Sequence, residues 1–316
     1  MNISIIIPNF NGASALKANI PSVISALLHC IKLKKIKGEI ILVDDGSIDD
    51  SVAVIETIQE ANKDLSIKLI KQEKNLGFSS TVNKGVIESK YDIVVLLNTD
   101  VKPEIDFLIP LLGHFVDEEV IAVGCMDKSI EGGKVVLRGR GLGKWIRGFL
   151  NHTRGDIDKS ETLWVSGGSS AFRKSIWARL GGMYEIYNPF YWEDLDLSYR
   201  ALKAGYKVNF ENKSIVSHFH EKGVIKNLYK PSRVKIVSYT NQIIFAWINM
   251  TDTDIIFTHF SLIPYHLFLA LVHRDIYFIL GFFNAAINLG KIVNLRKQTQ
   301  NFVVKTDREV IQSISG

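Results

Sequence analysis

Apolar and polar positions in the first hundred residues alternate between two periods. Some apolar runs are continuous and rich in Ile and Val, which is typical of strands buried on both faces of a parallel sheet. The segments between these runs space their apolar residues as one face of a helix does. Strands and helices that alternate at short intervals predict an α/β fold, with a mostly parallel central sheet flanked by helices. The expected strands are residues 3–8, 38–47, 66–73 and 91–100, and the expected helices are residues 14–33, 49–62 and 77–90.

The pattern changes after residue 120. A strand at residues 120–125 precedes residues 132–154, which are rich in Gly, Lys and Arg and contain no acidic residue. We expect a loop there, either solvated or acting as a mobile lid over a phosphate group, because Gly permits hinging and Arg suits phosphate. Residues 162–182 then predict strand, glycine turn, strand and helix, and an amphipathic helix begins at Glu193. A last strand ends near His218.

The tail of the chain is strongly apolar. A membrane-spanning helix needs about 20 apolar residues, and residues 255–272 are interrupted by two histidines and by Pro264. We therefore expect helices that lie in the membrane interface or pack on the preceding domain, since aromatic and Leu faces beside basic residues suit the interface. The expected division is residues 1–240 and residues 241–316.

Composition narrows the possible partners. The chain has 316 residues, and Lys+Arg 38 against Asp+Glu 33 gives a net charge of +5, which is far from a nucleic-acid-binding extreme. A small polyanionic ligand or an anionic membrane surface fits this charge, and we expect no nucleic-acid partner. Cys30 and Cys125 lie far apart in apolar surroundings, so we expect two buried thiols in a reduced, cytosolic protein. The first residues read as a strand rather than a signal peptide.

Polar residues close several of the expected strands. They lie at residues 8–12, 44–47 and 98–100. Each alone is an ordinary turn, but the carboxyl ends of parallel strands meet at one edge of a sheet, where such folds bind ligands. Together they predict a site.

An ordered set of motifs runs through the first 225 residues: "IIIPNFNG", "ILVDDGSIDDS", "KNLGFSSTVNKGV", "LLNTDV", "SGGSSAFRKS", "FYWEDLDLSYRALKAGYKV" and "VSHFH". The set resembles the family 2 glycosyltransferases, and within them a bacterial branch that contains rhamnosyltransferases. The resemblance implies the Rossmann-like GT-A fold, here followed by a C-terminal apolar helical tail. It also implies transfer of a sugar from a nucleotide diphosphate sugar donor to a glycan or lipid-linked glycan acceptor.

The resemblance assigns a nucleotide-binding wall. Asp45 matches the family acid near the base and ribose, with Asp44 sharing that role or supporting the turn; either acid could instead cap the following helix. Carboxylates accept hydrogen bonds from ribose hydroxyls or a base N–H. The other expected substrate-binding residues on this side are Pro8, Asn9, Asn11, Asn75, Gly77 and Asn83.

A metal site is implied at residues 98–100. Asp100 matches the second acid of the family's DxD-like triplet, which binds Mg²⁺ or Mn²⁺ together with the donor phosphates. Asn98 replaces the first acid, so we expect it to contact ribose or metal-bound water. His218 matches a late family histidine that completes the metal shell, with His220 as the competing residue.

The pair Glu193 and Asp194 is implied to be catalytic. Asp194 matches the general base of an inverting transfer, which takes the acceptor proton, and Glu193 is expected to orient the acceptor. The alternative is an acidic first helical turn favoured by the helix dipole. Trp192 offers a flat surface for a sugar or belongs to the core, and Gly168 matches an acceptor-side turn.

The expected function is therefore an inverting, metal-dependent glycosyltransferase at the cytoplasmic face of the cell membrane, in which Asp45, Asp100 and Asp194 share one cleft. Two alternatives stay open: a nucleotidyltransferase of similar architecture, and a non-catalytic nucleotide-sugar-binding assembly protein. A nucleotidyltransferase would need a basic, Gly-rich signature after the first strand, and residues 8–17 lack it. The non-catalytic alternative is considered because Asn98 stands where the family has an acid.

Overall fold

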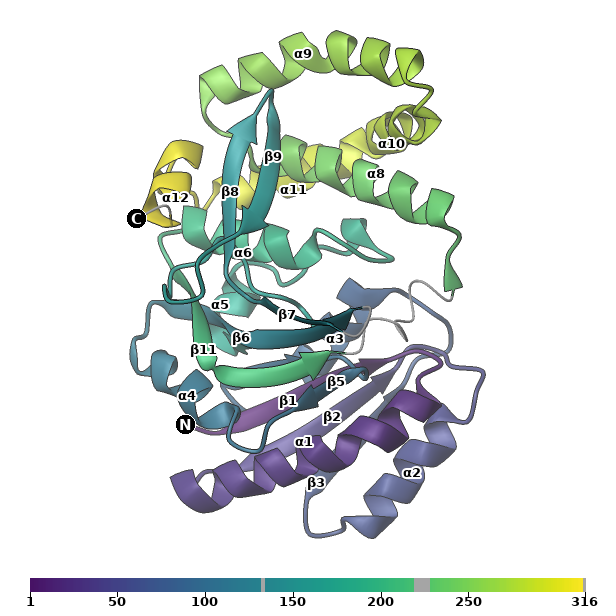
Figure 1. The fold of residues 1–316 in the computed structure, drawn as a ribbon, viewed down its shortest axis with the longest axis vertical. Coiled ribbons are helices and arrows are strands. Elements are labelled where there is room, and N and C mark those ends of the chain that lie inside the picture. The colour runs from purple at the N-terminus through teal and green to yellow at the C-terminus, as the bar shows by residue number, and fades with distance from the viewer. Residues whose placement is uncertain (132–133, 219–227, 315–316) are drawn as a thin grey trace.

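A nine-stranded sheet forms the centre of the computed structural model, which describes residues 1–131, 134–218 and 228–314 (Figure 1). Its strand order is β3-β2-β1-β4-β10-β6-β11-β5, with β7 paired to β6. The first four strands in this order are parallel, as the apolar runs predicted, whereas β10 is antiparallel to both of its neighbours. The strands are β1 (Ile3–Asn9), β2 (Gly38–Asp44), β3 (Ser66–Lys71), β4 (Ile93–Leu97), β5 (Val101–Pro103), β6 (Val120–Glu131), β7 (Lys134–Arg138), β10 (Ser169–Arg173) and β11 (Lys207–His218).

Helices cover both faces of this sheet. The period of two along β1 sends Ile5 into the core beneath α1 and Ile6 into the core beneath α3 and α6. Buried thiols Cys30 and Cys125 belong to the first of these cores. The helices of the sheet region are α1 (Ala13–Lys34), α2 (Ser51–Ala61), α3 (Phe78–Glu88), α4 (Leu108–Gly113), α5 (Lys174–Arg179) and α6 (Glu193–Lys203).

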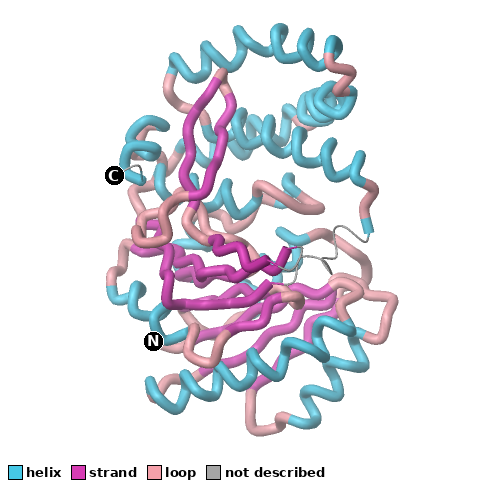
Figure 2. Tube along the Cα trace, in the orientation of Figure 1, coloured by secondary structure: helices cyan, strands magenta, loops and turns pink. Residues whose placement is uncertain are grey.

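The apolar tail folds into a helical layer over α6 (Figure 2). Helix α8 lies nearest to the sheet region and α9 lies outermost (Figure 1). Helix α9 continues through Pro264 without a break, and the division expected at residue 240 falls inside α8. The helices are α8 (Pro231–Asn249), α9 (Thr253–Val272), α10 (Ile276–Ile287), α11 (Leu289–Gln300) and α12 (Asp307–Ile314).

The loop expected at residues 132–154 is wrong for its described part. Strand β7 extends the sheet, and β8 (Gly141–Ile146) pairs with β9 (Phe149–Arg154) in a separate hairpin that reaches α9 (Figure 1). The tip of the hairpin touches the helix so closely that a Cβ on Gly148 would lie 2.4 Å from the Cα of His259. The strand expected at the start of residues 162–182 is also wrong, because residues 162–168 belong to no named strand. Thr162 and Leu163 each donate only a single backbone hydrogen bond, to Val208 of β11 and to Gly141 of β8.

Candidate active site

A cavity of about 580 Å³ opens at the carboxyl ends of β1 and β4 and at the first turn of α6. This volume lies in the range of small-molecule sites. Asp45, Asp100 and Asp194 all line it, as expected of one shared cleft. The other expected site residues on its wall are Pro8, Asn9, Asn75, Gly77, Asn98, Gly168, Glu193 and His218.

Asp45 organises one wall of the cavity. Its Oδ1 accepts from the backbone N–H of Leu76 at 2.7 Å, and its Oδ2 accepts from that of Gly77 at 3.0 Å. Burial raises the pKa of Asp45, and these two hydrogen bonds limit the rise. The carboxylate therefore fixes the loop that leads into α3.

Asp44 and Asn11 shape the turns behind this wall. Asp44 is buried and accepts from Asn9 Nδ2 at 2.7 Å and from Ser47 Oγ at 2.6 Å. Asn11 has a left-handed backbone (φ 51°) and accepts from the N–H of Ile48. Neither residue lines the cavity, whereas Asn9 does, and the Oδ1 of Asn9 has no hydrogen-bond partner within the described residues.

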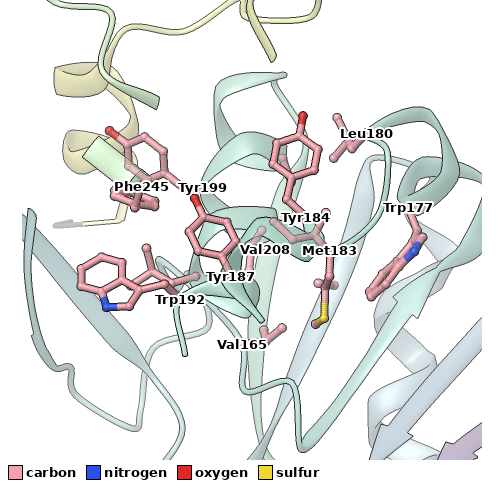
Figure 3. Packing of buried hydrophobic residues seen from close by; sticks show 14 of the residues in the cluster. Val165, Trp177, Leu180, Met183, Tyr184, Tyr187, Trp192, Tyr199, Val208 and Phe245 are labelled. Carbon is pink, nitrogen blue, oxygen red and sulfur yellow. The ribbon is translucent and has the colours of Figure 1, made fainter. Parts of the chain in front are cut away.

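Two other expected contacts also lie away from the cavity. Asn83 bonds to both the carbonyl oxygen and the N–H of Met183. Trp192 is only 9% exposed and packs against Phe245 in the core (Figure 3). The neighbouring Tyr191 lines the cavity instead and is 41% exposed.

The side chains of Asp100 and His218 lie next to each other in the cavity wall. The Nε2 of His218 lies 3.2 Å from Asp100 Oδ2, and its Nδ1 lies 3.2 Å from Asp127 Oδ2. Burial alone would lower the pKa of His218, but the hydrogen bonds to both carboxylates raise it to about 9. Among the described residues no group of three or more His, Cys, Asp or Glu side chains could hold a metal ion by itself. The competing residue His220 lies outside the described residues.

A backbone contact between Asn98 and Gly168 joins the end of β4 to the turn before β10 within the cavity wall. Asn98 N–H donates to the carbonyl oxygen of Gly168 at 2.9 Å. A Cβ on Gly168 would lie 2.5 Å from Asn98 Nδ2, so a side chain at residue 168 would displace that of Asn98.

Glu193 and Asp194 have different surroundings although they are adjacent. Asp194 Oδ2 accepts from Gly167 N–H at 3.1 Å, and its Oδ1 accepts from Leu195 N–H at 2.7 Å. The Oε2 of Glu193 is buried and has no hydrogen-bond partner in the described part of the chain. Burial, followed by the charge of Asp194, raises the pKa of Glu193 well above its usual range. Burial also raises the pKa of Asp194, but its two backbone hydrogen bonds favour the charged form. Glu193 therefore holds a proton more readily than Asp194 does.

Sequence reasoning missed several residues of the cavity wall. Arg138 was considered only as one of the basic residues of segment 132–154, and Tyr229 belongs to none of the motifs, yet both line the cavity. A periodicity argument could have found neither, because both reach the site through tertiary packing. Pro189 and Leu228 also lie outside the motifs. The remaining lining residues lie within the quoted motifs: Phe10, Phe78, Thr81, Thr99, Ser166, Gly167 and Phe190.

Residues 4–181 match the family model described as "Glycosyl transferase family 2", which covers more than half of the chain. The chain belongs to this family. The glycosyltransferase resembles the pre-mycofactocin glycosyltransferase of Mycobacterium tuberculosis, with 27% identity over 222 residues that cover 69% of this chain and 43% of the relative. It also resembles the O-antigen chain rhamnosyltransferase RfbN of Salmonella typhimurium, with 26% identity over 226 residues, 70% of this chain and 67% of the relative. The matched region thus spans less than half the length of the first of these relatives.

Solved structures show the same GT-A fold. GalNAc-T7 with UDP, GalNAc and Mn²⁺ superposes with a TM-score of 0.69 at 17% identity, over 100% of this chain and 56% of that one. S. aureus TarS 1-349 in complex with UDP-GlcNAc gives a TM-score of 0.59 at 14% identity, over 99% and 91% of the two chains. The expected fold class is therefore confirmed.

Proposed function

We propose that this family 2 member is an inverting, metal-dependent glycosyltransferase that moves a sugar from a nucleotide diphosphate sugar to a hydroxyl of a growing or lipid-linked glycan. One observation carries the proposal: a single cavity brings together the Asp45 wall, the Asp100–His218 pair and the Glu193–Asp194 pair. Relatives and solved structures named for nucleotide sugars and cell-surface glycans support it.

In this mechanism Asp194 accepts the proton of the acceptor hydroxyl. The acceptor oxygen forms a bond to the anomeric carbon while the bond from that carbon to the diphosphate breaks, and the nucleoside diphosphate leaves. Inversion follows because the base and the leaving group lie on opposite sides of the sugar ring. Glu193, whose pKa burial raises well above its usual range, forms a hydrogen bond with a substrate hydroxyl.

Asp100 and His218 fit a divalent ion, which would bind the neutral imidazole and displace the proton that the two carboxylates favour on His218 in its absence. Their oxygen and nitrogen donors lie together at the cavity, and Asp127 holds the second ring nitrogen of His218, as carboxylates do for metal-binding histidines. Mg²⁺ or Mn²⁺ sites of this kind take few protein ligands and complete the shell with phosphate and water. When bound, the ion would neutralise the charge that develops on the departing diphosphate.

Replacing Asp100 with Asn should weaken Mn²⁺ binding by roughly tenfold or more, since a charged oxygen ligand is lost. Mn²⁺ titration followed by electron paramagnetic resonance, with a nucleoside diphosphate present, measures this directly. Asp106→Asn is the matched control, because Asp106 is exposed and lies outside the cavity. Equal Mn²⁺ affinity in both variants would remove Asp100 from the metal site.

Product analysis tests the proposed reaction. The protein is incubated with a panel of nucleotide sugars and Mn²⁺, with and without extracted lipid-linked glycans, and the released nucleotides are separated. Release of a nucleoside diphosphate with sugar transfer supports the proposal. Release of pyrophosphate would indicate a nucleotidyltransferase, and binding without turnover would indicate a non-catalytic assembly protein.

We also propose that α9 and α10 rest on the cytoplasmic face of the membrane. By length and composition α1 and α9 are long and apolar enough to cross a membrane, and α10 with α11, bent by 69°, could form a further span. However, α1 covers the sheet, and His259 of α9 is 1% exposed and bonds to the Gly148 carbonyl oxygen of the hairpin. One face of α9 is therefore attached to the protein and the other is free. The exposed apolar side chains on α9 and α10 include Phe257, Phe260, Phe268, Leu271, Val272, Ile276, Phe283 and Ile287.

The double variant Phe268→Glu/Leu271→Glu should lower binding to anionic phospholipid vesicles by roughly tenfold or more. Full burial of one such side chain contributes about 1.5–3 kcal/mol, and both residues are more than half exposed in the protein. Vesicle flotation at low and high salt measures the binding. Ile87→Glu/Val116→Glu serves as the control, since these residues are even more exposed than Phe268 and Leu271 but lie on the sheet region. Equal losses in the two double variants would argue against a surface specific to α9.

A further inference from the structure

The backbone just before the catalytic pair has an unusual conformation. Tyr191 (φ 72°) and Trp192 (φ 77°) are consecutive non-glycine residues in the left-handed region, and Glu193 follows at once. Such residues cost free energy and persist only where their surroundings hold them. The segment therefore needs attachments on both sides.

Helix α3 holds the first part of this segment. Asn188 Oδ1 accepts from Ser79 N–H at 3.0 Å, and Asn188 Nδ2 donates to Ser80 Oγ at 2.8 Å. The N–H of Phe78 donates to the carbonyl oxygen of Pro189. These contacts involve residues 188 and 189 only. The two left-handed residues, Tyr191 and Trp192, must therefore be held by a partner in another part of the chain.

Asn241 of α8 is that partner. Its Nδ2 lies 2.8 Å from the carbonyl oxygen of Tyr187, 3.0 Å from that of Phe190 and 2.9 Å from that of Tyr191. Asn241 is only 2% exposed, so its two amide hydrogens are shared among these three carbonyl oxygens away from bulk water. Phe245, one turn further along the same helix, packs against the ring of Trp192 with a centroid distance of 5.2 Å.

We propose that Asn241 is a positioning residue for the general base. By holding the left-handed turn, it fixes the start of α6 so that Asp194 Oδ2 meets Gly167 N–H and Glu193 faces the cavity. Asn241 itself does not line the cavity, and it lies outside residues 4–181, the part that matches the family model. The inference rests on the proposed role of Asp194.

The test is Asn241→Ala in the full chain. We expect kcat to fall by about 10²-fold, since a small misplacement of a catalytic group has effects of this size. The affinity for a nucleoside diphosphate with Mn²⁺ should change less than about twofold, because that wall comes from β1, β2 and α3. The acid limb of the kcat/KM profile should move to higher pH, since loss of the Gly167 hydrogen bond would raise the pKa of Asp194.

Gln242→Ala is the matched control, because Gln242 is the next residue on α8 and does not line the active-site cavity. Asn241→Ser keeps a small donor and replaces the alanine variant if that variant does not fold. Its kcat should then be clearly lower than that of Gln242→Ala.

Three outcomes would overturn the inference. These are an unchanged kcat and pH profile, an equal loss of nucleotide affinity and kcat, and loss of cooperative melting in both Asn241 variants, which would assign Asn241 to the fold. An inactive wild-type protein would instead overturn the proposed function, so the two failures are distinguishable.

Discussion

Replacing Asp194 with Asn should lower kcat by about 10²- to 10⁴-fold, the usual contribution of a general base. The amide keeps the size of the side chain but cannot accept the acceptor proton. Its surroundings change little, because one oxygen still accepts from Gly167 or Leu195. Steady-state transfer assays measure kcat, and calorimetry should find nucleoside diphosphate affinity within about twofold of the wild type.

Glu193→Gln provides the comparison for this prediction. Burial and the charge of Asp194 raise the pKa of Glu193 well above its usual range, and its proposed role is a hydrogen bond rather than proton transfer. The amide can also form that hydrogen bond, so Glu193→Gln should lose less activity than Asp194→Asn. If Asp194→Asn retained turnover, or if the Gln variant lost more than the Asn variant, the two roles would have to be exchanged or abandoned.

Replacing Asp307 with Ala should lower the free energy of unfolding by about 3–5 kcal/mol, the usual cost of leaving one charge of a buried pair without its partner. Asp307 Oδ1 lies 2.8 Å from Lys203 Nζ, and both side chains are fully buried. Asp307 also accepts from Tyr199 Oη and from the N–H of Thr251. Urea denaturation followed by circular dichroism measures the loss.

Acid should remove the same stabilisation. Burial raises the pKa of Asp307, but Lys203 outweighs it and brings the pKa below the ordinary value of 3.8. A carboxyl whose pKa is lower in the folded state stabilises the fold above its unfolded pKa, and this contribution is lost as the pH falls through the folded-state pKa.

Arg308→Ala is the control for the buried pair. Arg308 lies on α12 next to Asp307 and pairs with Asp254 of α9, but both side chains of this pair are more than half exposed, and exposed pairs typically contribute about 0–1 kcal/mol. Lys203→Met/Asp307→Leu should recover most of the loss, because hydrophobic replacement of a whole buried pair is often neutral. Similar losses for Asp307→Ala and Arg308→Ala would contradict the assignment.

The sequence predicted the parallel half of the fold because its strands are buried on both faces, which leaves continuous apolar runs. It failed at residues 134–154, where Gly and basic residues suggested a loop, since the partners of β7 and of the hairpin are set by tertiary contacts. The strand-end residues Asp45 and Asp100 could be predicted to face one cavity because parallel strands end at one edge.

Side-chain direction was harder to predict. Trp192 offered a stacking surface in the sequence, but its left-handed backbone turns it into the core and leaves Tyr191 at the cavity. The roles of Asn241 and Asp307 could hardly be predicted from the sequence. Asn241 is simply a polar residue in an apolar tail, and Asp307 is an acid near the end of the chain. Their partners, the turn before α6 and Lys203, become neighbours only once the chain is folded.

Helix α8 also sets a rule for building chimeras between members of this family. A junction at residue 240 would combine the first half of α8 from one parent with the second half from another, and would place Asn241 and Phe245 opposite a turn with which they had not been selected. Gly281 of α10 adds a further mismatch, because a Cβ there would lie 2.7 Å from the Cβ of Tyr239. Exchanges made at Lys230, before the helix begins, keep α8 and its helical neighbours from a single parent. Asn241 and Phe245 then still face a turn from the other parent, so residues 187–192 have to be exchanged together with α8.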